Sequence, residues 1–299
     1  MEQQASGDIP VLFIEGRVLP EAWEKAVLAV WDKGMPMRTQ YDRRGADGEF
    51  LDPPSRDATV MVKVSEPYGE PRVHRNFPGG PSELEVYRQE VVEGIHDHWI
   101  DPTDDKWTYT YHERLFDYQV TDDLADRSRR KTFAPVDQIE CIVNSLLDTW
   151  YTRRAQAITW MPTADPGTYD PPCLQRIWCR LSVEDSGMVL NLNAHWRSRD
   201  LYKAWFMNAY ALTDLQRLIA ESIQERWQRP IRVGRYVDIA DSLHIYGSYT
   251  NEIVSEIEKM RGDQDYRSRS WASDNPLLTQ MIAETRQHLA VDPDFMKSS

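Results

Sequence analysis

Cysteine is scarce in this chain: only Cys141, Cys173 and Cys179 occur among its 299 residues. Three thiols at these positions do not suggest the framework of a disulfide-rich secreted protein, and no Cys or His spacing suggests a zinc site. A reducing compartment is the default setting for such a chain. The sequence therefore predicts a cytoplasmic protein that holds no metal.

Long apolar runs are missing as well. No uninterrupted hydrophobic stretch approaches the roughly 20 residues that a membrane-spanning helix needs. The N-terminus also lacks the basic and then apolar pattern of a secretory signal. We therefore expect no association with a membrane.

Positive charge is in short supply. Lysine and arginine together number 35 against 48 aspartates and glutamates, which gives a net charge of −13. Such an excess of acid argues against binding to a nucleic-acid backbone, so no nucleic-acid partner is expected. It leaves room for a local basic pocket that binds one phosphate group.

The chain does contain enough apolar and aromatic material for a sizeable core. Hydrophobic residues make up 41% of the sequence, with 11 tryptophans and 14 tyrosines. No internal repeat, low-complexity tract or linker divides the chain. The sequence therefore predicts one domain over residues 1–299.

The most informative stretch runs from 171 to 210. Residues 175–183 alternate between two faces with a period of two, which predicts a strand, and Glu184–Gly187 is a turn signal. A second alternating strand follows over 188–195. Residues 197–200 close this hairpin, and a helix then carries Asn208.

Elsewhere, apolar residues spaced three and four apart predict helices, and alternation predicts strands. Ser82 and Glu85 match a capping box at the start of a further helix, and the aromatic run 107–111 is typical of a core strand. The predicted helices cover 20–34, 137–150, 204–227, 250–260 and 276–290, and the predicted strands cover 58–64, 155–161 and 231–239.

Chemically useful side chains gather in the central stretch. A thiol at Cys173 follows a Pro-Pro pair, the hairpin ends in Arg-Ser-Arg-Asp over 197–200, and an amide at Asn208 comes eight residues after Asp200. A thiol, a basic and hydroxyl cluster, a carboxylate and an amide are the groups needed to attack an electron-poor ring and to hold an anionic substrate.

The ordered set of Pro-Pro-Cys, Arg-Ser-Arg-Asp and the downstream asparagine resembles the thymidylate synthase family. That resemblance implies an α+β fold in which a large, twisted, mixed β-sheet is covered by helices. It also implies a two-fold dimer through the sheet with shared active sites.

The resemblance implies roles for the central residues. Cys173 would be the nucleophile that adds to C6 of a pyrimidine, with Arg197 lowering its pKa. Arg197 and Ser198 would bind the substrate phosphate, and Asp200 would anchor the pterin of the cofactor. Asn208 would read the base edge, which points to uracil.

Further residues outside the central stretch match family motifs. Glu83, in Glu-Leu-x-x-Tyr, resembles the glutamate that relays protons to O4 of the pyrimidine, with Glu85 and Glu90 as nearby rivals. Tyr111 matches an active-site tyrosine, with a core role as the alternative. Trp99, Trp107 and Trp205 are candidates to cover the pterin ring.

The remaining matches concern the sugar and the phosphate of the substrate. His244 and Tyr246 would hold the 3′-hydroxyl of the sugar. Arg43 resembles the N-terminal phosphate-binding loop, with Arg38 as a rival. Arg153 and Arg154 would reach across the dimer interface to the phosphate in the partner's site.

The implied reaction is C5 methylation of a pyrimidine nucleoside monophosphate, dUMP to dTMP, with 5,10-methylenetetrahydrofolate as cofactor and no metal. A 5-hydroxymethylase acting on dUMP, dCMP or CMP is the alternative. The family's glycine after the Asp is Ala204 here, and the C-terminus is polar instead of a short apolar tail. A catalytically silent nucleotide-binding member is a third hypothesis, against which the intact Cys173, Arg197 and Asn208 argue. The sugar type and the exact pterin stay open.

Overall fold

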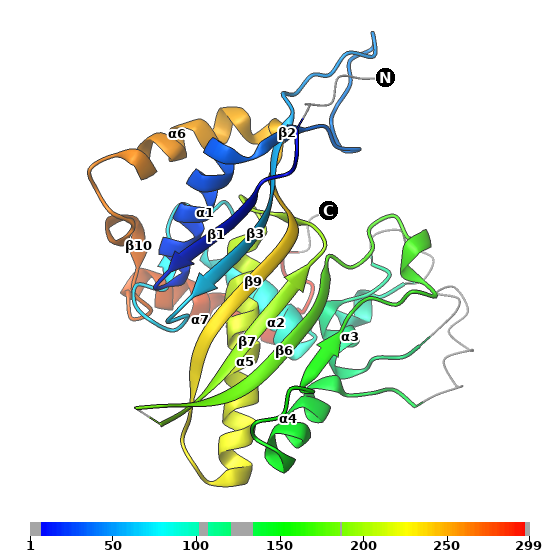
Figure 1. Ribbon diagram of the computed structural model, residues 1–299, viewed down its shortest axis with the longest axis vertical. Coiled ribbons are helices and arrows are strands. Elements are labelled where there is room, and N and C mark those ends of the chain that lie inside the picture. The colour runs from blue at the N-terminus through cyan, green and yellow to red at the C-terminus, as the bar shows by residue number, and fades with distance from the viewer. Residues whose placement is uncertain (1–6, 102–106, 121–133, 186, 297–299) are drawn as a thin grey trace.

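A mixed eight-stranded sheet organises the chain in the computed structural model (Figure 1), which describes residues 7–101, 107–120, 134–185 and 187–296. The strand order is β1-β3-β9-β7-β6-β5, with β2 paired to β3 and β8 paired to β9. The strands of this sheet are β1 (Val11–Gly16), β2 (Met35–Met37), β3 (Ser55–Val64), β5 (Gln156–Ile158), β6 (Leu174–Glu184), β7 (Gly187–Trp196), β8 (Arg199–Asp200) and β9 (Ile231–Ile245). A separate two-stranded sheet pairs β4 (Val73–His74) with β10 (Ser270–Trp271).

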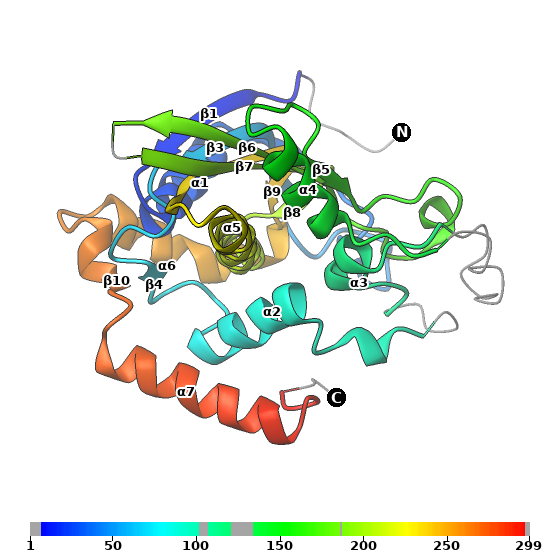
Figure 2. The ribbon, with the colours of Figure 1, turned by 90° about the horizontal axis from the view of Figure 1, so that it is seen from below.

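The helices lie mainly against one face of the large sheet. In Figure 2, α5 lies directly below the sheet, α2 lies below α5, and α7 forms the outermost layer. The α-helices are α1 (Leu19–Lys33), α2 (Pro81–Glu93), α3 (Tyr111–Phe116), α4 (Gln138–Asp148), α5 (Trp205–Trp227), α6 (Thr250–Arg261) and α7 (Pro276–Val291). Short 3₁₀ turns are η1 (Asp97–Trp99), η3 (Asp165–Gly167), η4 (Gly247–Tyr249) and η5 (Tyr266–Arg269). Within the described ranges, no helix combines the length and hydrophobicity needed to cross a bilayer.

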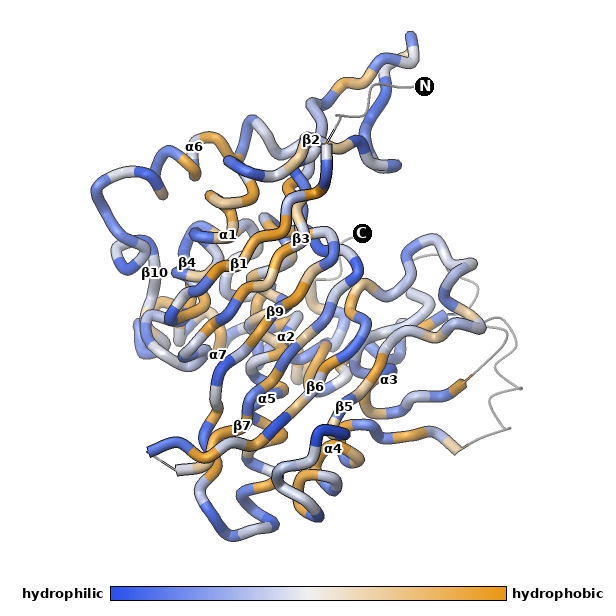
Figure 3. Tube along the Cα trace, viewed as in Figure 1, coloured by the Kyte–Doolittle hydropathy of each residue, from blue (hydrophilic) through white to orange (hydrophobic). Residues whose placement is uncertain are grey.

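The opposite face of the sheet carries no helix among the described residues (Figure 2). Hydrophobic residues are frequent along β1 and β3 (Figure 3), and alternation along each strand sends every second side chain to the uncovered face. Phe13 is 62% exposed and Met61 is 41% exposed, while their neighbours Ile14 and Val62 are buried under the helices. The fold therefore leaves an apolar sheet surface in contact with solvent in the single chain.

Helix α5 is buried between the sheet and α2. Its side chains toward the sheet include Gln216, whose Nε2 donates to the carbonyl of Leu190 at 2.7 Å. The pairing of β7 with β9 shifts register between Leu190 and Leu192. A bulge of this kind leaves backbone groups without ladder partners, and the buried amide of Gln216 satisfies one of them.

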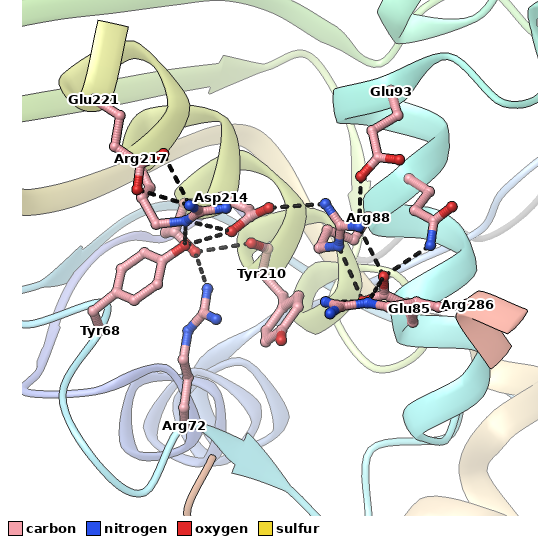
Figure 4. Close-up of polar contacts among 12 residues, drawn as sticks. Tyr68, Arg72, Glu85, Arg88, Glu93, Tyr210, Asp214, Arg217, Glu221 and Arg286 are labelled. Atoms are coloured by element: carbon pink, nitrogen blue, oxygen red, sulfur yellow. Dashed lines mark hydrogen bonds and ion pairs between the residues drawn. The ribbon is translucent and has the colours of Figure 1, made fainter. Parts of the chain in front are cut away.

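A network of charged side chains joins α2, α5 and α7 (Figure 4). Arg88 donates to Glu85 at 2.7 Å and to Asp214 at 3.0 Å, and both carboxylates are buried. Arg286 of α7 reaches the same Glu85 at 2.7 Å, and Arg217 reaches Asp214 at 3.0 Å. The outermost helix is therefore attached to the core through a buried carboxylate.

Arg88→Met is expected to lower the free energy of unfolding by at least about 3 kcal/mol, because it leaves Glu85 and Asp214 buried without their shared cation. Arg267→Met is the control, since its partner Asp265 is exposed. An exposed pair of this kind contributes about 0–1 kcal/mol. Denaturant unfolding of both variants measures the difference, and equal small losses would contradict a stabilising role for the network.

Most predicted elements are confirmed to within a few residues, but the start of α2 is not as predicted. The N-cap is Gly80, Pro81 occupies the first turn, and no side chain caps the helix. The prediction that Ser82 and Glu85 form a capping box is wrong, because Glu85 is drawn into the buried contacts with Arg88 and Arg286.

The aromatic run 107–111 is also not a strand. Tyr111 begins α3, and the hydroxyl of Thr110 accepts a hydrogen bond from the backbone N–H of Glu113 at 2.9 Å. Thr110-x-x-Glu113 is a helix-start signature. The local capping bond therefore outweighs the strand preference of the tyrosines.

Candidate active site

A cavity of about 800 Å³ opens at one end of the large sheet. The strand pairing explains why the functional side chains meet there. Antiparallel pairing of β6 with β7 sets Leu174 opposite Trp196, so Cys173 lies beside Arg197. Parallel pairing of β8 with β9 then sets Asp200 beside His244.

Backbone and side-chain contacts fix Arg197 against the Pro-Pro-Cys segment. The backbone N–H of Arg197 donates to the carbonyl of Cys173 at 2.9 Å. Its guanidinium donates to the carbonyls of Pro172 at 3.0 Å and Pro171 at 2.5 Å. Among the described residues Arg197 has no carboxylate partner, so its positive charge remains available to an anion in the cavity.

The thiol of Cys173 faces the cavity and is partly buried. Burial raises the pKa of Cys173 above its usual value, Arg197 acts in the opposite direction, and Asp170 adds to the rise. The charge of Arg197 lowers the pKa of Cys173, as the resemblance implied, but in the single chain the desolvation of the thiolate outweighs this nearby cation.

The Arg-Ser-Arg-Asp segment holds two further charged groups at the cavity. Arg199 is 3% exposed, forms an ion pair with Asp238, and stacks on the ring of Trp196 at 3.9 Å. Asp200 accepts hydrogen bonds from the backbone N–H groups of Tyr202 and Lys203 at 2.9 and 3.0 Å.

The end of β9 supplies an imidazole, and the turn that follows it supplies two phenols. His244 is 6% exposed, and burial lowers its pKa, so the neutral ring is favoured. Its Nε2 is buried and has no hydrogen-bond partner among the described residues. Tyr246 lies against the His244 ring, and the hydroxyl of Tyr249 donates to Asp200 at 2.9 Å.

Helices α2 and α5 contribute a hydrogen-bonded pair to the cavity wall. Asn208 is 8% exposed, and its Nδ2 donates to the phenol oxygen of Tyr87 at 2.5 Å. Both side chains line the cavity. This pairing lets the asparagine be buried without an unsatisfied donor.

Two more tyrosines stand beside the thiol. The hydroxyl of Tyr111 accepts from the backbone N–H of Leu174 at 3.2 Å, and the Tyr109 ring meets it edge to face with 5.6 Å between centroids. Burial raises the pKa of both phenols, which keeps them protonated and able to donate.

Eight of the side chains predicted for the site line the cavity: Cys173, Tyr111, Arg197, Ser198, Asp200, Asn208, His244 and Tyr246. Glu83 does not. It is exposed in the first turn of α2, and its rivals Glu85 and Glu90 are bonded to Arg88 and His96. No glutamate lines the cavity in the part of the chain that the structure describes.

The basic residues outside the central stretch fall in two places. Arg38 lines the cavity, whereas Arg43 points to solvent and pairs with Asp52 at 2.6 Å. Arg153 and Arg154 are exposed between α4 and β5 and do not line the cavity of their own chain. The tryptophans expected to cover a pterin also lie elsewhere, because Trp205 is fully buried and Trp99 stacks on His96.

Sequence reasoning missed several residues of the cavity wall. Arg199 belongs to the Arg-Ser-Arg-Asp motif and Tyr87 to the Glu-Leu-x-x-Tyr motif, but the sequence assigned no role to either, and only the fold shows that they line the cavity. Tyr41 and Tyr249 carried no recognisable signal. Within the described ranges, no cluster of three or more His, Cys, Asp or Glu side chains is arranged to hold a metal ion.

Comparison with known proteins gives a consistent result. A sequence model of the family described as thymidylate synthase matches residues 80–266. A relative from Methanococcoides burtonii named "Putative thymidylate synthase" is 26% identical over 234 residues, which is 78% of this chain and 88% of the relative. One with the same name from Methanopyrus kandleri is 28% identical over 212 residues, covering 70% and 84%.

The fold is also found among solved structures. Thermostable thymidylate synthase A from Bacillus subtilis superposes with a TM-score of 0.54 at 15% identity, covering 81% of this chain and 84% of that one. This match supports the α+β fold with its large mixed sheet. Because the family model spans more than half of the chain and includes the cavity's central stretch, the chain belongs to the thymidylate synthase family.

Proposed function

We propose that this protein is an enzyme that transfers a one-carbon unit to C5 of a pyrimidine nucleoside monophosphate, converting dUMP to dTMP. The observation that carries the proposal is the thiol of Cys173 on the same cavity wall as Arg197, Asp200 and Asn208. A nucleotide-binding protein without chemistry would have no need of a thiol in this position.

The chemistry follows from the weakness of C5 as a nucleophile. Addition of the Cys173 thiolate to C6 forms an S–C6 bond and moves the C5=C6 electron pair toward C5 and O4. C5 then becomes nucleophilic. Formation of the thiolate is favoured near Arg197, whose charge opposes the effect of burial on the pKa of Cys173.

The base would be read by Asn208. An amide carries both a donor and an acceptor, which complement O4 and N3–H of uracil. His244 and Tyr246, at the other side of the site, would hold the sugar, with the unpartnered Nε2 of His244 available to the 3′-hydroxyl.

The phosphate would need cations from a second chain. Three arginines and five aspartates line the cavity among the described residues. Arg199 is committed to Asp238 and Arg38 to Asp42, which leaves Arg197 as the arginine of the cavity wall without a carboxylate partner. We propose that Arg153 and Arg154 of a partner subunit complete the site in a two-fold dimer formed through the uncovered sheet face.

The cavity also suits a reduced folate. Its volume lies in the upper part of the usual range for ligand sites, about 300–1,000 Å³. Asp200 accepts three hydrogen bonds within the chain, and a carboxylate has roughly four acceptor sites, so it can still accept from a pterin N–H. When bound, 5,10-methylenetetrahydrofolate supplies the one-carbon unit and the reducing equivalents for a methyl product.

A specific observation favours hydroxymethylation as the second candidate. Ala204 lines the cavity and is the N-cap residue of α5. The C-terminal segment packs away from the cavity, where His96 contacts the carbonyl of Pro293 at 3.2 Å. Methyl transfer needs water to be excluded from the intermediate. A site that stays open to water would give a hydroxymethyl product.

Incubation with methylenetetrahydrofolate and dUMP, dCMP or CMP separates these functions. Methylation of dUMP predicts a product heavier by one CH₂ group and a rise in near-ultraviolet absorbance from dihydrofolate. A flat absorbance trace with a hydroxymethyl product would establish the alternative, and no product with any nucleotide would contradict both.

Asn208→Asp is expected to shift the preference of the enzyme toward the cytosine nucleotide. The kcat/KM for dCMP, divided by that for dUMP, should rise by about 10²-fold, because each mismatched buried polar group costs roughly 1–3 kcal/mol. A protonated carboxyl matches N3 and the 4-amino group of cytosine. Asn193→Asp, whose side chain bonds Arg235 away from the cavity, is the matched control. A parent enzyme that already prefers a cytosine nucleotide would show that another residue selects the base.

A further inference from the structure

The cavity wall holds a phenol where the family resemblance led us to expect a carboxylate. Glu83, the expected acid, is exposed at the start of α2. One helical turn later, Tyr87 lines the cavity. Its neighbour in the cavity is Asn208, the side chain proposed to read the base. The hydroxyl of Tyr87 therefore lies beside the amide that is proposed to read the base.

The direction of the hydrogen bond defines what this pair offers to a ligand. The Nδ2 of Asn208 donates to the phenol oxygen of Tyr87 at 2.5 Å, and the hydroxyl has no other hydrogen-bond partner among the described residues. Its own hydrogen is therefore free to point into the cavity. Asn208 keeps its Oδ1 as an acceptor. Because the Nδ2 of Asn208 is engaged by Tyr87, the donor toward O4 of uracil in this arrangement is the phenol and not the amide, while the Oδ1 of Asn208 keeps its role as the acceptor for N3–H.

We propose that Tyr87 is a catalytic residue that donates a hydrogen bond to O4 of the pyrimidine while Asn208 accepts from N3–H, so that a phenol replaces the expected glutamate. This inference rests on the proposed function, because it assumes that the base binds beside Asn208.

The step that Tyr87 assists is the addition of the Cys173 thiolate to C6. As the S–C6 bond forms, the C5=C6 electron pair moves to the C4–C5 position and negative charge develops on O4. A donor already in place at O4 stabilises that charge without reorganisation. The proton stays on the phenol as a hydrogen bond, so no further acid or base is required at this atom.

The surroundings of Tyr87 suit a donor role. Burial raises the pKa of the phenol well above its usual value, so the hydroxyl stays protonated across the neutral range. The amide of Asn208 fixes the oxygen from one side. Three carboxylates lie within four residues of Tyr87 on α2, and none of them lines the cavity: Glu83 is exposed, Glu85 is bound to arginines, and Glu90 is bound to His96.

The test is Tyr87→Phe in the full-length protein, assayed by release of tritium from [5-³H]dUMP with methylenetetrahydrofolate. We expect kcat to fall about 10²–10³-fold, the effect of removing one donor from an oxyanion site. The KM for dUMP should change much less than kcat, because the bond strengthens only as charge develops on O4.

Tyr118→Phe is the matched control. Its buried hydroxyl donates to the carbonyl of Trp160 at 3.0 Å and lies outside the cavity wall. Both variants lose one phenol hydroxyl and one hydrogen bond, so a purely structural role would lower their melting temperatures alike and leave kcat alone.

Two results would count against the inference, and they are distinguishable. In the first, the wild-type protein is active and the kcat of Tyr87→Phe stays within about threefold of the parent value. Such a change is well under the tenfold that corresponds to 1.36 kcal/mol, so it would show that Tyr87 has no part in the chemistry and would leave the proposed function intact. A wild-type protein that releases no tritium would overturn the proposed function and the role of Tyr87 with it.

Discussion

Replacing Cys173 with alanine should lower kcat by more than about 10⁴-fold, because a covalent mechanism has no alternative path once its nucleophile is gone. The thiol of Cys173 faces the cavity, and the backbone carbonyl of Cys173 is held in place by a hydrogen bond of 2.9 Å from the backbone N–H of Arg197. Single-turnover assays with dUMP and methylenetetrahydrofolate measure the loss. Binding of dUMP should persist, since Asn208 and Arg197 are unchanged.

Cys179→Ala is the control for this experiment. Cys179 lies in β6, the strand that follows Cys173, is fully buried, and its pKa is raised to about 12 by burial. Its substitution should cost about 1 kcal/mol of stability through lost packing and leave kcat nearly unchanged. Turnover by Cys173→Ala within tenfold of the parent would contradict the assignment of the nucleophile.

Replacing both Arg153 and Arg154 with alanine should lower kcat/KM for dUMP by about 10²–10⁴-fold, because each hydrogen bond to a charged group contributes roughly 1.5–3 kcal/mol. The loss should appear mainly in KM, since a phosphate contact holds the substrate and its transition state alike. Neither arginine lines the cavity of its own chain, so a loss of this size would mean that the two arginines bind the phosphate in the cavity of a second chain.

Mixing the two variants, and assaying at a dUMP concentration well below the KM of the double-arginine variant, distinguishes a shared site from an indirect effect. A hybrid of Cys173→Ala with the Arg153→Ala, Arg154→Ala variant contains one site with both an intact thiol and intact arginines. Activity should therefore return after subunit exchange. Exchange that is demonstrated by native mass spectrometry but restores no activity would contradict the shared site. Arg232→Ala, which removes another exposed arginine paired with Glu184, is the matched control.

Patterns of short period predicted most of the fold. Alternation predicted the hairpin of β6 and β7 nearly to its ends. The helix predicted to begin at 137 does so, with the side chain of Asp137 capping α4 by accepting from the backbone N–H of Glu140 at 2.8 Å. The failures came where distant contacts override local preference. Glu85 left its predicted cap because Arg88 and Arg286 compete for it, and no local pattern contains Arg286.

The same limit applies to the site. Cys173, Arg197 and Asn208 were predictable because they lie within one contiguous motif. The choice between Arg38 and Arg43 depended on the path of a loop, and the burial of Arg199 on its pairing with Asp238 from another strand. The lowering effect of Arg197 on the pKa of Cys173 was predictable, but the larger effect of burial was not, because a sequence shows the neighbouring cation and not the extent of desolvation.

Trapping with 5-fluoro-dUMP tests the central claim most directly. Fluorine cannot leave C5 as a proton does. Once the thiolate has added to C6 and C5 has taken up the one-carbon unit, the protein, the nucleotide and the folate should therefore remain covalently joined. Peptide mass spectrometry after incubation with methylenetetrahydrofolate should find the nucleotide and the folate together on the peptide that contains Cys173. An unmodified protein, or an adduct on Cys141 or Cys179, would contradict the account.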